Sequence, residues 1–113
     1  MKVLVCGSRQ WTDWESIEKR LCMLPAGTTI ISGAARGADS IAASIGRKLG
    51  REVREFPAEW DRFGRSAGYR RNMLMLDEDP DLVIAFQVGN SPGTAHAIET
   101  ARKREIPVEV IRR

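Results

Sequence analysis

The order of apolar and polar positions along the chain predicts strands and helices that alternate from one end to the other. Short apolar runs rich in β-branched residues are typical of strands buried on both faces of a parallel sheet. Between these runs, apolar residues recur every three or four positions, the spacing that places side chains on one face of a helix. Strands are therefore expected over Lys2–Cys6, Thr28–Ser32, Glu52–Phe56, Asp81–Phe86 and Pro107–Ile111.

Four helices are expected between the strands. The first covers about Trp14–Met23, after a capping box of the form Thr12-x-x-Glu15, and Pro25 and Gly27 stop it. Residues 57–66 are expected to be irregular. The other helices are expected over Ile41–Leu49, which Gly50 closes, and over Ala67–Asp77 and Gly93–Arg104.

Five strands joined by four helices predict an α/β fold, a Rossmann-like three-layer α/β/α sandwich with a five-stranded parallel sheet. The 113 residues, of which 42% are hydrophobic, correspond to one domain over residues 1–113. In such sheets ligands bind beyond the carboxyl ends of the strands, near the point where the strand order reverses. That edge is where candidate site residues are sought.

Three glycine-rich loops each follow a predicted strand and so share this edge: Gly7-Ser8-Arg9, Gly33–Asp39 and Gly89–Thr94. Glycine lets backbone N–H groups approach a ligand, and a helix start adds unpaired N–H donors and the positive end of a dipole. The third loop enters a helix directly and is the best phosphate cradle. The alternative for each loop is that its glycines serve only to form the turn from strand to helix. No GxGxxG or GxxxxGK[ST] motif is present, which argues against an ordinary dehydrogenase and a nucleoside triphosphatase.

The connection from Phe56 to Asn72 concentrates arginine and aromatic residues. Its rings, Trp60 and Phe63, suit stacking on a base, and arginines can grip a phosphate through two parallel hydrogen bonds. Connections this long in so small a domain are usually functional. The alternative is a surface loop whose aromatic rings pack on the core. The phosphate-binding candidates here are Arg65, Arg70 and Arg71.

Charge and cysteine content narrow the function classes only slightly. The net charge of +3, from 18 basic and 15 acidic residues, is weak evidence for nucleic acid, and the basic clusters fit one phosphorylated small molecule equally well. Cys6 and Cys22 have no metal-ligand spacing and are expected to be buried core residues, with a catalytic thiol as the alternative. No metal and no cofactor are expected. No apolar run reaches the roughly 20 residues of a membrane helix, and the first residues do not form a secretory signal. A cytoplasmic protein without a membrane partner is expected.

Several single residues admit a structural and a functional interpretation. His96 suits an ordinary helix position better than catalysis, and Asp39 suits an N-cap as well as a ligand contact. Trp11 and Trp14 are expected to pack in the core or at the start of the first helix.

Five motifs follow one another along the chain: Val5–Arg9 with Trp11 and Asp13, Ser32–Asp39 with Ala42, Phe56–Trp60, Gly64–Asn72 with Met75, and Pro92–Ala95. In this order they resemble the SLOG superfamily, in particular its YspA/YpsA-related branch of small domains. The resemblance covers almost the whole chain. It implies a Rossmann-like sheet that binds nucleotide-like ligands at the first strand's loop and at the Gly-Thr loop. The superfamily includes the lonely-guy (LOG) phosphoribohydrolases and the Rossmann domain of DprA, and related domains often dimerise, which suggests a homodimer.

The lonely-guy pattern is only partly retained. Arg71 and Met75 keep its Arg-Lys-x-x-Met motif, but Asn72 replaces the lysine. Its Gly-Thr-x-x-Glu motif keeps the glycine and threonine but has Ala97 at the glutamate, and Glu99 lies about 200° round the helix from that position. The acid expected to assist N-glycosidic cleavage is therefore missing. Glu59 and Asp39 are the candidates to replace it.

The function expected from these patterns is binding of a nucleotide or ribose-phosphate ligand, as a sensor or a weak processing enzyme. One alternative is a nucleotide N-glycosidase, and another is a single-stranded nucleic-acid binder. The ligand-binding candidates are Gly7, Ser8, Arg9, Gly33, Arg36, Gly37, Asp39, Trp60, Arg71, Asn72, Gly93 and Thr94.

Overall fold

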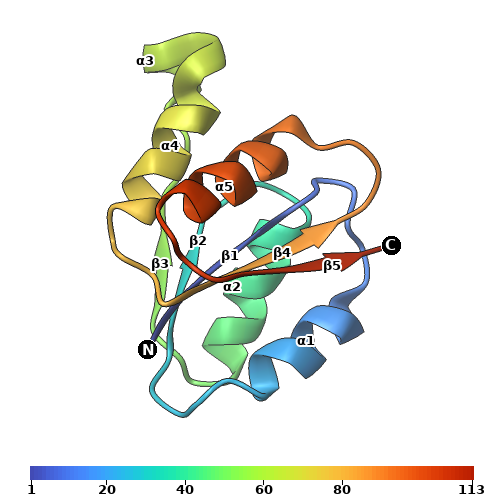
Figure 1. Cartoon of the computed structure of the whole chain (residues 1–113). Coiled ribbons are helices and arrows are strands. Elements are labelled where there is room, and N and C mark those ends of the chain that lie inside the picture. The colour runs from blue at the N-terminus through green and yellow to red at the C-terminus, as the bar shows by residue number, and fades with distance from the viewer.

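A computed structural model describes residues 1–113, and its five strands form one parallel sheet in the order β3-β2-β1-β4-β5 (Figure 1). In the register of the three central strands, Leu4 lies opposite Ile31 on one side and Val83 on the other. The strands are β1 (Lys2–Gly7), β2 (Thr29–Ser32), β3 (Val53–Glu55), β4 (Leu82–Gln87) and β5 (Val108–Arg112). The predicted parallel sheet is confirmed.

Helices cover both faces of the sheet, as a three-layer sandwich requires. Alternate residues of a strand point to opposite faces, so Val3 and Val5 pack with α1 and α2, whereas Leu4 and Cys6 pack with α4 and α5. The main helices are α1 (Trp14–Cys22), α2 (Ala38–Lys48), α4 (Ala67–Leu76) and α5 (Pro92–Lys103). None of the helices is long and apolar enough to cross a membrane.

The segment expected to be irregular contains a short helix, α3 (Trp60–Phe63), and a 3-10 turn, η1 (Gly64–Ser66). This segment precedes α4, and α3 projects at the end of α4 away from the sheet (Figure 1). None of the α3 residues is buried. A single helical turn without a buried face has no apolar repeat, which is why the sequence pattern did not reveal it.

Three local expectations were wrong. The N-cap of α1 is Asp13 rather than Thr12, because the Asp13 carboxylate accepts the Ser16 N–H at 3.2 Å. Cys22 is exposed because it lies about 100° round α1 from the buried Leu21. Trp14 is exposed as well.

The core position near the start of α1 belongs to Trp11, whose ring meets the edge of Phe86 at a centroid distance of 5.3 Å. The Trp11 indole N–H donates to the Asp13 carbonyl at 2.9 Å. A buried indole normally needs such a partner. This bond ties the buried ring to the residue that caps α1.

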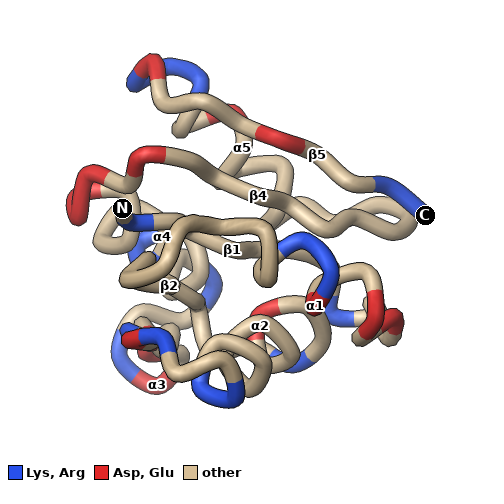
Figure 2. The backbone as a smooth tube through the Cα atoms, turned by 90° about the horizontal axis from the view of Figure 1, so that it is seen from below, with Lys and Arg blue, Asp and Glu red and all other residues tan.

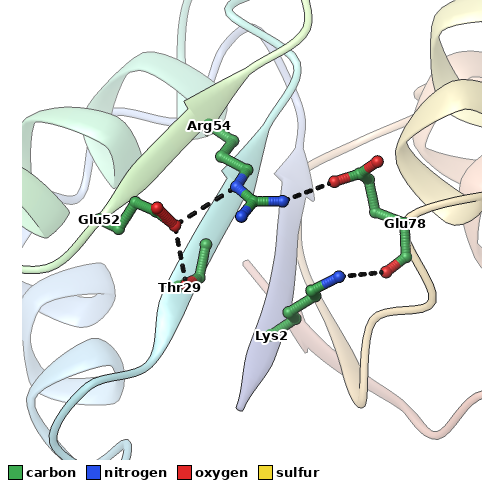
Figure 3. Close-up of polar contacts among 5 residues, drawn as sticks. All are labelled: Lys2, Thr29, Glu52, Arg54 and Glu78. Carbon is green, nitrogen blue, oxygen red and sulfur yellow. Dashed lines mark hydrogen bonds and ion pairs between the residues drawn. The ribbon is translucent and has the colours of Figure 1, made fainter.

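Ion pairs and hydrogen bonds connect side chains at the amino-terminal edge of the sheet (Figure 3). Arg54 lies between Glu78, at 2.8 Å, and Glu52, at 3.3 Å. Lys2 donates to the Glu78 carbonyl at 3.0 Å, and the Thr29 hydroxyl donates to Glu52 at 3.3 Å. The charged groups at this end of the sheet are thus satisfied within the protein.

Candidate functional site

A cavity of about 350 Å³ opens beyond the carboxyl ends of β1 and β4, and is called the first cavity below. The strand order reverses between these two strands, since β1 leads to β2 on one side and β4 leads to β5 on the other. Gly7 and Arg9 line the cavity from the end of β1, Asn72 lines it from α4, and Asn90–Thr94 line it from the start of α5. The cavity therefore lies at the switch point where open α/β sheets bind ligands.

The start of α5 forms one wall of the first cavity. The helix begins at Pro92, and the Thr94 side chain is buried with its hydroxyl 2.8 Å from that of Ser91. A side chain added at Gly93 would meet nothing within 4 Å. Because N–H groups in the first turn of a helix lack partners within the helix, this wall suits an anion.

Gly93→Glu is expected to weaken phosphate binding at this wall by about tenfold or more, because it places a carboxylate where the phosphate would lie. The variant should fold, since the position is open and an acidic residue stabilises a helix N-terminus. Calorimetric titration with AMP measures the effect. Gly93→Gln is the matched neutral control, and equal affinities of the two variants would contradict a phosphate site here.

Arg71 and Asn72 form a hydrogen-bonded bridge from α4 to the neighbouring loops. Arg71 donates through Nη1 to the Gly33 carbonyl and through Nε to the Asn72 side chain at 3.2 Å. The Asn72 amide donates to the Gly93 carbonyl at 3.1 Å and lies 3.2 Å from Nδ1 of His96. Asn72, at the lysine position of the lonely-guy pattern, thus holds Arg71 and the start of α5 in fixed relative positions.

Asp39 is the one carboxylate among the residues that line the first cavity. Its side chain is buried, Oδ2 accepts the Ala35 N–H at 3.4 Å, and Oδ1 has no hydrogen-bond partner. Burial raises the pKa of Asp39 to about 6, although the charge of Arg71 acts in the opposite direction. Asp39 does not cap α2, whose N-cap is Gly37, with a φ of 78°. Its carboxyl is therefore free of a helix-capping role.

Burial shifts other groups near the cavity in the same direction, toward their uncharged forms. It lowers the pKa of Arg71 and of His96, and it raises the pKa of the Cys6 thiol. No group of three or more His, Cys, Asp or Glu side chains lies together in a way that could hold a metal ion. Arg9, Arg65 and Arg71 are the basic residues that line the cavity, and Asp39 is the acidic one.

Three arginines, Arg9, Arg65 and Arg71, line the first cavity, and none has a carboxylate oxygen within 4.0 Å. Elsewhere arginines such as Arg20 and Arg104 are paired with acidic side chains. Charged residues of both signs are distributed over the whole fold (Figure 2). The surface is therefore not uniformly basic, and the first cavity is a place where three arginines without a carboxylate partner converge.

Two aromatic rings complete the lining. Trp60 is 49% exposed, and the Arg9 guanidinium lies 5.6 Å from its ring centroid. Tyr69 packs against His96 at a centroid distance of 4.5 Å. Phe63, the other candidate for base stacking, is covered by Arg70 at 4.4 Å and does not line the cavity. The rings available to a ligand are those of Trp60 and Tyr69.

The structure brings most of the candidate residues together, but not all. Gly33 and Arg36 line a neighbouring cavity. Ser8 lines neither cavity, because its buried hydroxyl bonds to both the N–H and the carbonyl of Val88 at 3.0 Å. Gly37 also lines neither, since a side chain there would collide with the Ser8 carbonyl. The candidates that line the first cavity are Gly7, Arg9, Asp39, Trp60, Arg71, Asn72, Gly93 and Thr94.

Several lining residues, Gln10 and Tyr69 among them, were not among the ligand-binding candidates. Tyr69 lies three residues before Asn72 on α4, and residues three apart share a helix face. That spacing could have identified it. No comparable pattern marks Gln10. Glu59, proposed as a replacement acid, is exposed and lies 3.8 Å from Arg62, outside the cavity lining.

The fold and the position of the cavity define a Rossmann-like domain, and comparison with known proteins specifies the family. Residues 1–63 match the model of YAcAr, the YspA, cpYpsA-related SLOG family. The chain is also 37% identical to the Gene 61 protein of Mycobacterium phage D29, over 95% of this chain and 93% of that protein. The chain belongs to the YspA, cpYpsA-related SLOG family.

A solved structure shares the fold. DNA processing protein A (DprA) from Streptococcus pneumoniae matches with a TM-score of 0.59 and 18% sequence identity, over 95% of this chain. This chain spans 57% of the DprA chain. At this identity the match establishes a common Rossmann-like architecture.

Proposed function

We propose that the first cavity binds a nucleotide or another ribose phosphate, with the phosphate held between Arg71 and the start of α5. The observation that carries this proposal is the convergence of three unpaired arginines and a helix N-terminus on one cavity. Arginine presents several N–H donors in a planar fork that matches phosphate oxygens. Asp39 is the one acidic residue beside these three arginines, and a phosphate would supply further negative charge.

The rest of the lining suits the nucleoside part. Trp60 and Tyr69 offer exposed rings to a base, and Asp39 offers a carboxylate to ribose hydroxyl groups. Its Oδ1 lacks a partner in the protein, and a buried acceptor without a partner costs free energy. A ligand hydroxyl would satisfy it. The cavity thus combines phosphate, sugar and base recognition.

Calorimetric titration with AMP, ribose 5-phosphate and adenosine tests the proposal. AMP and ribose 5-phosphate are expected to bind, AMP more tightly because of its base, and adenosine to bind at least about tenfold more weakly than AMP. The reason is that only the first two carry the phosphate that the arginines require. Adenosine binding as tightly as AMP would contradict the assignment of a phosphate site.

Single-stranded nucleic acid is the second candidate ligand. Exposed rings beside unpaired arginines are the combination that binds bases and backbone without sequence preference. Binding of a strand would weaken steeply with salt because counterions are released. Titration with an oligothymidylate at two salt concentrations separates this candidate from a mononucleotide site.

The protein is expected to be a poor phosphoribohydrolase, releasing adenine from AMP well below about 1 s⁻¹. Loss of the base builds positive charge on the sugar, and removal of a group that stabilises such charge typically costs about 10²-fold in rate. Ala97 is buried in the core without a charge, and Glu99 pairs with Lys103 at 3.1 Å. Chromatography of the released base measures the rate.

Asp39 is the lining residue that could supply the missing acid. Turnover at about 1 s⁻¹ or faster would contradict a binding-only site. If Asp39→Asn then abolished that turnover while Glu59→Gln did not, Asp39 would be the acid and the protein an N-glycosidase.

A further inference from the structure

A chain of hydrogen bonds connects Arg71 on α4 with the start of α5, and the buried Asn72 side chain stands at its centre. Nε of Arg71 lies 3.2 Å from the Asn72 amide oxygen. The Gly93 carbonyl and Nδ1 of His96 lie 3.1 Å and 3.2 Å from the Asn72 amide nitrogen. A single buried amide therefore has three partners, and two of them belong to α5.

Two of these partners fix how the amide of Asn72 is oriented. A guanidinium N–H can only donate, and a backbone carbonyl can only accept. The amide oxygen must therefore face Arg71, and the amide nitrogen must face Gly93. The nitrogen has two hydrogens, of which one serves the Gly93 carbonyl and the other points to His96. Nδ1 of His96 must accept this second hydrogen.

The acceptor role of Nδ1 specifies one form of the His96 ring. A ring nitrogen that accepts a hydrogen bond carries no proton, so the imidazole is neutral and its proton is on Nε2. Nε2 lies 3.5 Å from the hydroxyl of Thr100, one turn further along α5. The contacts on both sides of the ring thus agree on the same neutral form.

The surroundings of His96 favour its neutral form as well. Burial lowers the pKa of His96 from its ordinary value of 6.5, while Glu99 raises it and Lys103 lowers it. Glu99 and Lys103 lie on α5 and pair with each other at 3.1 Å, so their opposite effects partly cancel. From α4, the ring is faced by the Asn72 amide and by the ring of Tyr69, at a centroid distance of 4.5 Å. His96 is therefore expected to be uncharged at neutral pH.

A proton on Nδ1 of His96 would be incompatible with this chain of bonds. The ring would then present an N–H group to the amide nitrogen of Asn72, and two donors cannot form a hydrogen bond. Turning the amide over would bring its oxygen to His96, but it would set donor against donor at Arg71 and acceptor against acceptor at Gly93. No orientation of Asn72 satisfies all three partners when His96 is charged.

We propose that His96 is a positioning residue for phosphate binding: its neutral ring orients Asn72, which holds Arg71 and the start of α5 in place, and protonation of the ring releases them. This rests on the proposed function of the first cavity. His96 does not line that cavity, so it acts through Asn72 and not by contact with the ligand. The affinity for a phosphate ligand thereby becomes dependent on pH.

The sign of the pH effect separates positioning from direct attraction. An imidazolium attracts phosphate, so attraction alone would tighten binding when His96 is protonated, whereas loss of positioning weakens it. Two other groups titrate in the same range. They are Asp39, whose pKa burial raises to about 6, and the phosphate monoester, whose second pKa is about 6. Comparison of variants with the unmodified protein at each pH cancels both contributions.

The ring itself can be observed without a ligand, because His96 is the only histidine of the chain. NMR of the imidazole nitrogens over a pH series is expected to show the proton of the neutral form on Nε2, and a titration midpoint below 6.5. The side-chain amide signals of Asn72 should shift with the same midpoint. A neutral form with its proton on Nδ1, or Asn72 signals that do not follow the ring, would overturn the proposal.

Calorimetric titration with AMP at pH 7.5 and pH 5 tests the consequence for binding. His96→Leu removes the acceptor and is expected to weaken AMP binding by about fivefold at pH 7.5. His96→Gln offers an oxygen that accepts but does not titrate, so it should restore most of that loss. At pH 5 the unmodified protein is expected to bind AMP at least about threefold more weakly than His96→Gln.

Arg102→Ala is the matched control, since it removes an exposed charge of α5 that does not line the cavity. Its affinity relative to the unmodified protein should be the same at both pH values. If the unmodified protein binds more tightly than His96→Gln at pH 5, or if their ratio does not change with pH, the positioning role is wrong while the proposed function stands. Failure of the unmodified protein to bind AMP at either pH would overturn both.

Discussion

Arg71→Ala is expected to weaken AMP binding by about 100-fold, whereas Arg70→Ala should change it by less than about threefold. Arg71 lines both the first cavity and the neighbouring one, and it is partly withdrawn from solvent. In a partly buried site, loss of a charge that pairs with phosphate typically costs about 2 kcal/mol or more of binding free energy. Arg70 lies about 100° round α4, where its Nε bonds to Ser66 at 3.0 Å.

Thermal unfolding should accompany these titrations, because Arg71→Ala also removes the bonds to Gly33 and Asn72. Arg71→Lys keeps the charge but not the planar fork, so its affinity is expected to be intermediate. A larger loss for Arg70→Ala than for Arg71→Ala would show that the other face of α4 meets the ligand. Unchanged affinity in Arg71→Lys would mean that charge alone, without paired hydrogen bonds, holds the phosphate.

The second large effect expected concerns Asp39 and the pH dependence of stability. The difference in unfolding free energy between Asp39→Asn and the unmodified protein should shift in favour of the variant as pH rises from about 4 to about 6.5. The expected shift is up to about 3 kcal/mol. Burial raises the pKa of the folded Asp39 from 3.8 to about 6, and each pKa unit corresponds to about 1.4 kcal/mol. The side chain is only 5% exposed, so little of this penalty is relieved by water.

The sign follows from proton binding. At pH values below the pKa of Asp39 in the unfolded chain, the folded and unfolded states both hold the proton, so no charge is buried on folding. Between 3.8 and about 6 the unfolded chain loses the proton first, so folding must take one up and stability falls as pH rises. Above about 6 both states are ionised and the penalty stays constant. An asparagine carries no such charge and escapes the penalty.

Urea unfolding at pH 4, 5, 6 and 7 measures this difference between the variant and the unmodified protein. Comparison at each pH cancels the contributions of the other carboxylates. Asp61→Asn, at an exposed position on α3, is the control, because it removes a carboxylate that the fold does not bury. The same pH profile for both variants would mean that burial does not shift the titration of Asp39, and that a neighbour or bound water compensates it.

The sequence alone determined the architecture of this protein and the edge of the sheet where its candidate site lies. Buried strands such as Val3–Cys6 and Val83–Phe86 are continuous apolar runs, and the helices between them repeat apolar residues at a spacing of three or four. These signals are local, so they can be recognised without knowing which other strands and helices pack against each element. Parallel strands then place the loops at Gly7 and Gly93 on one edge, whatever the strand order.

Only the tertiary structure decided which residues at that edge face a cavity. Ser8 and Gly37 belong to the expected loops, yet one bonds to Val88 and the other packs on the Ser8 carbonyl, and both contacts depend on the strand order. α3 was missed because a single exposed turn has no repeat, although its Trp60 lines both the first cavity and its neighbour.

The unpartnered Oδ1 of Asp39 and the bond from Arg71 to the Gly33 carbonyl are also tertiary features. Asp39 comes from α2 and Arg71 from α4, and they meet over Gly33 at the end of β2. A sequence pattern records spacing along one element. Whether a charged group has a partner depends on side chains brought together from distant elements, and on this the proposed position of an anionic ligand rests.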